Sequence, residues 1–224
     1  MATTLLTEKQ LLKLLSFFRS YYRDNGRCFP WRSDRSTPFE ILVAEMLLRQ
    51  TRAEQVVAVW TSVLRKYPDP YWLSSSEPEA LFEIVRPLGL GTQQAIALNA
   101  MSTDIVERFQ GRVPRRLSEL TSLPHIGMYC ANAVACFGYR KRVPIVDSNV
   151  LRLFSRLTDI DYGKDNKRSA DILALAWEIL PRRAFVEHNY GVLDFSAQVC
   201  RPRGALHTEM CAERDLRLYG FFAE

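Results

Sequence analysis

Helical spacing of apolar residues runs along nearly the whole chain, and it restricts the fold more than any other feature. Apolar residues recur at three- and four-residue intervals in segments separated by short turns: 6–24, 38–50, 53–66, 78–88, 92–109, 117–122, 128–138, 148–158, 167–180 and 184–199. No segment alternates apolar and polar residues as a half-buried strand does, and the β-branched run 143–146 is only four residues long. The sequence therefore predicts an all-α fold.

Local signals mark several helix ends. Thr37, Pro38 and Glu40 form a capping box with proline in the first helical turn. Asn25-Gly26 stops the first helix, and Leu88-Gly89 closes the helix that begins near residue 78. Because these signals are local, we expect the corresponding helix ends to be well defined.

Size and charge limit the class of protein. The chain has 224 residues, 47% of them hydrophobic, which is enough for one large domain or two smaller lobes with a core. The net charge is +5, which fits a polyanionic partner and fits solvated loops equally well. The basic residues gather in clusters: Arg112/Arg115/Arg116, Arg140/Lys141/Arg142, Lys164/Lys167/Arg168, Arg182/Arg183 and Arg201/Arg203.

The sequence gives no sign of a membrane or secretory protein. No apolar run reaches membrane-spanning length, and the first ten residues lack the charged-then-apolar layout of a signal peptide. We therefore expect no membrane partner and an intracellular location, in the cytoplasm near the nucleoid of a bacterial or archaeal cell or elsewhere inside a cell.

The five cysteines do not form a recognisable framework: Cys28, Cys130, Cys136, Cys200 and Cys211. Their number is odd and no C-x-x-C pair occurs, so neither a disulfide framework nor a standard zinc site is expected. Cys130 and Cys136 lie in an apolar helix and are expected to be small buried hydrophobic residues.

Two helix starts lie twenty residues apart and carry the motifs with functional meaning. The run Leu123-Pro-His-Ile-Gly127 opens one helix, and backbone N–H groups at such a turn can hold a phosphate. Any helix–turn–helix corner could also use proline and glycine in this way. Asp147 opens the second helix, where its simplest role is that of an N-cap.

These motifs, taken with Phe29-Pro-Trp-Arg32 and Ala44-Glu-Met-Leu-Leu-Arg-Gln-Thr51, resemble the HhH-GPD superfamily of DNA glycosylases, in particular its MutY and Mig-type members. The resemblance extends over residues 28–200. It implies a two-lobed helical fold with a DNA-binding and active-site cleft between the lobes. The central six-helix lobe, 30–143, would contain the hairpin, and residues 1–29 with 144–224 would form the second lobe.

The resemblance implies catalytic roles for two carboxylates. Asp147 would stabilise the positive charge that develops on the sugar as the N-glycosidic bond breaks, and would guide the attacking water, in addition to capping its helix. Glu45 would contact the target base and help it depart. Its apolar helix is expected to favour the protonated form, although an ion pair with Arg49 four residues away is the alternative.

Tyr129 bears on whether the DNA strand is cut. Bifunctional relatives such as endonuclease III carry a lysine at this place, which attacks the sugar and forms a Schiff base. A tyrosine cannot form that imine, so the resemblance implies a monofunctional enzyme that uses water. The alternative is a tyrosine that only packs in the core.

Further residues are implied to contact DNA. Extruding a base leaves a gap in the duplex, and the resemblance assigns Gln50 and Leu90 to fill it, although Leu90 could instead pack at a helix C-terminus. Arg49 lies beside Gln50 on the same segment. The hairpin residues His125, Ile126, Gly127 and Tyr129 complete the expected DNA-binding set. The usual hairpin form is L-P-G-[VI]-G, so His125 replaces a glycine at a place that often needs positive φ.

Many relatives hold a [4Fe–4S] cluster through four cysteines spaced C-x6-C-x2-C-x5-C. Counted from Cys200, these places hold Cys200, His207, Met210 and Leu216, and Cys211 is one residue out of register. Because four thiolates are the normal requirement, no cluster and no other cofactor is expected. A metal site formed by Cys200, His207 and Cys211 is the alternative.

Two short motifs favour the Mig-type thymine glycosylases. Leu47-Leu-Arg-Gln-Thr51 is closer to their L-L-R-R-T than to the M-L-Q-Q-T of MutY, and Val146-Asp-Ser-Asn149 is closer to V-D-A-N than to D-G-N. We therefore expect a monomeric, monofunctional glycosylase that removes thymine and uracil mispaired with guanine in double-stranded DNA. The alternatives are excision of adenine opposite guanine or 8-oxoguanine, excision of another modified pyrimidine, and a non-catalytic DNA-binding protein on the same scaffold.

Overall fold

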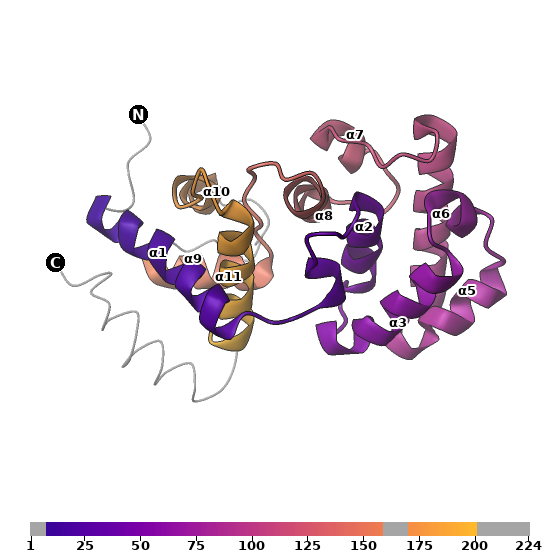
Figure 1. Ribbon diagram of the computed structural model, residues 1–224, viewed down its shortest axis with the longest axis horizontal. Coiled ribbons are helices and arrows are strands. Elements are labelled where there is room, and N and C mark those ends of the chain that lie inside the picture. Colours follow the sequence, from indigo (N-terminus) through magenta and orange to yellow (C-terminus); the bar gives the residue numbers. More distant parts are fainter. Residues whose placement is uncertain (1–7, 159–169, 201–224) are drawn as a thin grey trace. The chain divides into compact units, whose positions relative to one another are not determined.

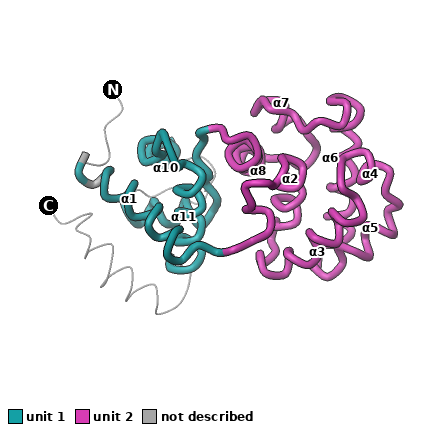
Figure 2. Tube along the Cα trace, viewed as in Figure 1, with its two compact units in different colours: residues 1–27, 142–224 teal, residues 28–141 magenta. Residues whose placement is uncertain are grey.

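The computed structural model describes residues 8–158 and 170–200 (Figure 1), and over these ranges it contains helices and no strand. The all-α prediction is therefore confirmed. The chain divides into two compact units (Figure 2), and each unit contains buried apolar residues of its own. We call residues 28–141 the central unit and residues 1–27 with 142–224 the terminal unit.

The central unit is a group of short helices around α2. Its helices are α2 (Pro38–Leu47), α3 (Ala53–Lys66), α4 (Pro70–Ser74), α5 (Pro78–Val85), α6 (Gly91–Phe109), α7 (Leu117–Thr121) and α8 (Met128–Ala133). Every residue of α2 from Ile41 to Leu47 is buried, and α2 contacts α3, α6 and α8. A helix that is apolar on all sides needs neighbours all round, which explains its central place.

The start of α2 has the predicted capping box. The Thr37 hydroxyl accepts a hydrogen bond from the Glu40 backbone N–H at 3.2 Å, and the Glu40 carboxylate accepts one from the Thr37 N–H at 2.6 Å. The two side chains thereby satisfy backbone donors that a helix start leaves open.

Three features of the central unit differ from the sequence prediction. The helix expected to reach Gln50 ends at Leu47, and Gln50 itself has a left-handed backbone with φ of 58°. The five-residue helix α4 was not predicted, although Asp69 caps it by accepting a hydrogen bond from the Trp72 N–H. The helix expected over 128–138 changes to a π-turn at Val134–Gly138.

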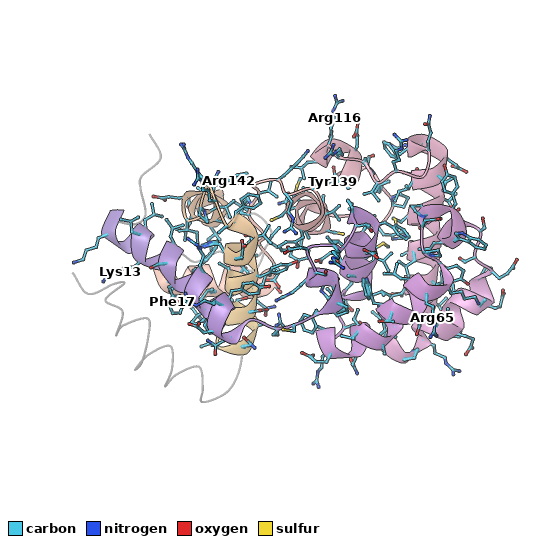
Figure 3. All side chains as sticks on the ribbon, in the orientation of Figure 1. Lys13, Phe17, Arg65, Arg116, Tyr139 and Arg142 are labelled. Carbon is cyan, nitrogen blue, oxygen red and sulfur yellow. The ribbon has the colours of Figure 1, made fainter. Side chains whose placement is uncertain are left out.

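The terminal unit packs the first long helix against the last. Its helices are α1 (Glu8–Asn25), α9 (Ser148–Thr158), α10 (Ala170–Glu178) and α11 (Phe185–Gln198). Between α1 and α11, Phe17 (labelled in Figure 3) and Tyr21 each meet Phe195 edge to face. Gly191 allows this close packing, because a Cβ there would lie 2.0 Å from the Phe18 carbonyl oxygen.

One ion pair of the terminal unit joins a partly exposed arginine to a buried aspartate. The Arg27 guanidinium donates to the fully buried Asp194 carboxylate at 2.7 Å, and the Arg27 backbone N–H donates to the same group at 2.8 Å. The second bond adds to the hydrogen bonding of a carboxylate that burial keeps away from water.

One predicted basic cluster is engaged within the protein. Arg140 pairs with Asp34 at 2.7 Å, Lys141 donates to the Arg115 carbonyl at 2.6 Å, and Arg142 donates to carbonyls in the last turn of α10 and just after it. The charge of this cluster therefore stabilises local structure as well as adding to the basic surface. Figure 3 labels Arg142.

Candidate active site

The hairpin lies between α7 and α8 and is held by its apolar residues. Leu123 and Ile126 are buried, and the Ile126 N–H donates to the Leu123 carbonyl at 3.2 Å. His125 is exposed between them and has φ of 63°, which confirms the positive φ expected at this place. The turn therefore has the expected conformation without the usual glycine.

Gly127 precedes α8 and leaves its first turn open. The N-cap residue is this glycine, so it has no side chain to cap the first turn, and a Cβ at Gly127 would meet no atom within 4 Å. The backbone of Gly127 is extended, with φ of −91°, so any residue could adopt it. The glycine is therefore not required by the conformation of the turn, and what it provides is unobstructed access to the backbone.

Glu45 lies on the buried helix α2 near the start of α8. Its side chain is 7% exposed, and α2 packs against α8. Burial raises the pKa of the Cys130 thiol well above its ordinary value; Glu45, when it is ionised, adds to the rise, and Arg49 opposes it. Glu45 and Arg49 are therefore both close enough to the first turn of α8 to act on its charge balance. Tyr129, in that same turn, is half-buried.

A cavity of about 280 Å³ brings together four of the residues predicted to contact DNA: Arg49, Gln50, Leu90 and His125. The Arg49 guanidinium lies 3.5 Å from the His125 carbonyl oxygen, which connects the end of α2 to the hairpin. Leu90 follows Gly89, whose φ of 82° reverses the chain before α6. The central unit thus places the predicted gap-filling residues and the hairpin around one hollow.

Gln94 also lines this cavity, and it was not predicted. It is 6% exposed, and its Nε2 donates to the Leu47 carbonyl at 3.3 Å. Its Oε1 is buried and has no hydrogen-bond partner in the part of the chain that the structure describes. A buried glutamine has no distinguishing pattern in a sequence, so only the packing of α6 on α2 reveals it.

Asp147 belongs to the terminal unit, where it caps α9 as predicted. Its Oδ1 accepts a hydrogen bond from the Val150 N–H at 2.7 Å, and its Oδ2 accepts one from the Asn149 side chain at 3.0 Å. The Arg152 guanidinium in turn donates to the Asn149 Oδ1 at 2.9 Å. The carboxylate is half-buried and held on both oxygens, so its orientation is fixed before any substrate binds.

Arg152 connects this group to the end of α11. It donates to the carbonyl oxygens of Ser196, at 3.1 Å, and Cys200, at 2.9 Å. The sequence motif gave no role to Asn149 or Arg152. Asn149 follows Asp147 by two residues and Arg152 follows it by five. Asn149 and Arg152 are therefore three residues apart, on one face of the helix, and this spacing is the signal that could have found them.

Cys200 is buried, and its Sγ lies 3.2 Å from the Arg156 guanidinium. The other places of the cluster motif, His207, Met210 and Leu216, lie outside the described residues, as does Cys211. Over residues 8–158 and 170–200 no group of three or more potential ligands could hold a metal ion. The donor set does not fit a four-thiolate cluster, since only one of its four places is a cysteine. The absence of the cluster remains a prediction.

No helix in the described ranges is long and apolar enough to cross a membrane. The buried positions of Cys130 and Cys136 agree with the sequence prediction. The intracellular location and the monomeric state remain predictions.

The chain is similar to several DNA glycosylases along most of its length. It is 33% identical over 210 residues to a thymine-DNA glycosylase of Aeropyrum pernix, covering 92% of each chain. It is 35% identical over 184 residues to a thymine/uracil-DNA glycosylase of Pyrobaculum aerophilum, covering 80% of each. An adenine DNA glycosylase of Mycobacterium tuberculosis is 35% identical over 206 residues, which cover 87% of this chain and 66% of that protein.

The solved structures agree with the sequence comparison. A thermostable thymine-DNA glycosylase superposes with a TM-score of 0.84 at 29% identity, over 91% of this chain and 93% of that one. Residues 43–181 match the family model for the HhH-GPD superfamily of base excision DNA repair proteins. The predicted resemblance, both to the superfamily and to its thymine glycosylases, is confirmed. The chain belongs to the HhH-GPD superfamily of base excision DNA repair proteins.

Proposed function

We propose that this protein is a monofunctional DNA glycosylase that removes thymine, and uracil, mispaired with guanine. The observation that carries the proposal is the Asp147 carboxylate, which is held on both oxygens at the start of α9 in a chain of this superfamily. The names of two similar relatives, a thymine-DNA and a thymine/uracil-DNA glycosylase, support the choice of base.

In the proposed reaction, Asp147 acts on the sugar. As the N-glycosidic bond breaks, its electron pair leaves with the base and positive charge develops on the sugar, which the carboxylate stabilises. Water then adds to the sugar carbon and gives a proton to the same carboxylate. The hydrogen bonds from Asn149 and from the Val150 N–H restrict the rotation of the carboxylate, so little reorganisation is needed as charge develops.

Glu45 acts on the departing base. A buried carboxyl group favours its neutral form, which can donate a hydrogen bond or a proton to a pyrimidine oxygen. The departing base needs such a donor because it receives the electron pair of the broken bond. Two carboxyl groups in different surroundings can thus serve opposite roles, one as a negative charge and one as a donor.

Double-stranded DNA with a mismatched or modified base is the proposed partner of a monomer. The open N-terminus of α8 and the hairpin residues His125, Ile126 and Gly127 hold a phosphate of the backbone. Gln50 and Leu90 fill the gap left by the extruded base, and Arg49 supports them from the rim of the same cavity. Tyr129 cannot form a Schiff base, so the strand stays intact after base release. The proposed enzyme works without an iron–sulfur cluster.

A panel of duplexes with single mispairs tests the proposal: G·T, G·U, A·G and A·8-oxoguanine, each incubated with enzyme and then treated with or without alkali. We expect base release from G·T and G·U, seen as strand breaks only after alkali. Release of adenine alone would favour the second candidate, which the similarity to adenine DNA glycosylases supports. Breaks without alkali would contradict the monofunctional assignment, and inactivity on every duplex would contradict glycosylase function.

A further inference from the structure

The backbone that leads to Asp147 is held by a side chain from a distant helix. Residues Val143 to Ile145 are buried, and no helix includes them. Asn189, on α11, is 3% exposed and donates from Nδ2 to the Val143 carbonyl at 3.0 Å. Its Oδ1 accepts a hydrogen bond from the Ile145 N–H at 3.2 Å. One carboxamide therefore satisfies both backbone groups.

The two hydrogen bonds of Asn189 fix the position of the backbone between Val143 and Ile145. In an extended segment the carbonyl of one residue and the N–H two residues later point to the same side, so a carboxamide can bind both as a neighbouring strand would. The side chain of Asn189 cannot be reversed here, because its oxygen would then face the Val143 carbonyl. Ile145, which precedes Asp147 by two residues, is therefore held at a defined distance from α11.

Asp147 is held from its other side by the same helix. Asn149 binds its carboxylate, Arg152 binds Asn149, and Arg152 also donates to the Ser196 carbonyl on α11. The hydrogen bonds of Asn189 act before Asp147 in the chain, and those of Arg152 act after it. α11 thus determines where the carboxylate stands within the terminal unit.

We propose that Asn189 is a positioning residue for the base-release reaction, which it serves by fixing the position of the Asp147 carboxylate. This inference rests on the proposed function. The stabilisation of a developing sugar cation depends on the distance to the anion. A misplacement of about 1 Å can reduce a rate about a hundredfold. Asn189 does not touch the substrate and acts only through Asp147.

The test uses Asn189→Leu, which has a similar volume and removes both hydrogen bonds. Two abasic probes opposite guanine report the position of the carboxylate: a duplex with a neutral tetrahydrofuran nucleotide and one with a cationic pyrrolidine nucleotide. We expect the wild-type protein to prefer the cationic probe. In Asn189→Leu the preference and the single-turnover rate of base release should each fall about tenfold, while affinity for the neutral probe stays unchanged.

Asn99→Leu is the matched control. The Asn99 carboxamide also holds a turn, by donating to the Ser74 carbonyl at 3.0 Å, but it does so in the central unit at the end of α4. We expect Asn99→Leu to lower the free energy of unfolding and to leave the preference for the cationic probe unchanged. Asn189→Ser, which keeps one hydroxyl donor, should give an intermediate preference.

The outcomes separate this inference from the function on which it rests. A wild-type protein without preference for the cationic probe would contradict the proposed role of Asp147 itself. A wild-type preference that survives in folded Asn189→Leu would overturn only the role of Asn189. The role of Asn189 is also overturned if Asn99→Leu reduces the preference equally, or if neither Asn189 variant folds, because asparagine would then be needed for the fold and not for positioning.

Discussion

The starts of α8 and α9 lie twenty residues apart in the chain and are built in opposite ways. At α8, the N-cap Gly127 has no side chain that could cap the first turn, and a Cβ there would meet no atom within 4 Å. At α9, Asp147 occupies the corresponding place with its own carboxylate, which the Val150 N–H and Asn149 hold. Helix N-termini favour negative charge. One start therefore carries its anion, and the other is free to receive one, which we propose to be a DNA phosphate.

The largest expected effect comes from removing the charge at α9. Asp147→Asn keeps an oxygen that can accept from the Val150 N–H, so the cap is retained, but it loses the negative charge that stabilises the sugar cation. We expect the single-turnover rate of base release to fall about 10²- to 10⁴-fold, with unchanged affinity for mismatched DNA. The rate is measured by alkali cleavage with enzyme in excess over duplex.

Asp69→Asn is the matched control for that prediction. Asp69 caps α4 in the same manner, by accepting from the Trp72 N–H at 3.0 Å, and it is not part of the proposed site. Its substitution should leave the rate within about twofold of wild type. If Asp147→Asn did the same, the carboxylate would be a helix cap and nothing more.

Acid should destabilise the terminal unit, which contains α9. The group responsible is His188, the neighbour of Asn189 on α11. Burial lowers the pKa of His188 from 6.5 to about 3, and the positive charge of Arg19 adds to the effect. The folded protein keeps this imidazole neutral, whereas the unfolded chain binds a proton below pH 6.5. The stabilising contribution of the neutral imidazole is therefore complete above pH 6.5 and falls between pH 6.5 and 3, by up to about 1.4 kcal/mol per pH unit.

Urea unfolding at pH 7, 6 and 5 measures this effect, with His188→Gln as the comparison. Between pH 7 and pH 5, the free energy of unfolding of the variant should fall clearly less than that of the wild type. Amide hydrogen exchange at pH 5 should show that 143–150 and α11 lose protection before α8 does. Equal slopes in the two proteins would mean that another group causes the acid sensitivity.

A methyl group added at Gly127, before α8, should weaken DNA binding without destabilising the protein. At Gly127 the added Cβ meets open space and the φ of −91° suits alanine, so Gly127→Ala should unfold at a temperature equal to or slightly above that of wild type. We expect mismatched duplex to bind about tenfold more weakly, the equivalent of one hydrogen bond to a charged group. Gly191→Ala, whose Cβ would lie 2.0 Å from a carbonyl oxygen, should instead destabilise the fold. Unchanged DNA affinity in Gly127→Ala would argue against a phosphate at the hairpin.

The fold was predicted well where the signals are local. The helices over 53–66 and 148–158 begin and end as expected, because a proline, a cap or a break in periodicity stands at each end. Helix α4 was missed because five residues are too few to show a period. The sequence predicts Gln50 in a helix, but α2 ends at Leu47 and Gln50 has a left-handed backbone, a conformation for which glutamine has no particular preference.

In the candidate site, too, features with local sequence signals were predicted and features that depend on distant contacts were not. The cap at Asp147 and the positive φ of His125 follow from short motifs and are confirmed. The contacts of Asn189 with Val143 and Ile145 join residues more than forty positions apart, and no spacing rule connects them. Whether a carboxylate only caps a helix or is also held in place thus depends on contacts that are visible only in the structure.

The smallest expected effect concerns His125, whose positive φ is strained for a residue with a Cβ. His125→Gly relieves the strain but adds freedom to the unfolded chain, so we expect a gain of less than about 1 kcal/mol in the free energy of unfolding by urea. His125→Val should lose about 1 kcal/mol, because a β-branched residue adopts this conformation poorly. If the hairpin binds phosphate through its backbone, both variants should bind mismatched duplex within about threefold of wild type once folded. A large loss of affinity in His125→Gly at normal stability would show that the imidazole itself contacts DNA, and the open start of α8 would then bind through a side chain as well as through its backbone.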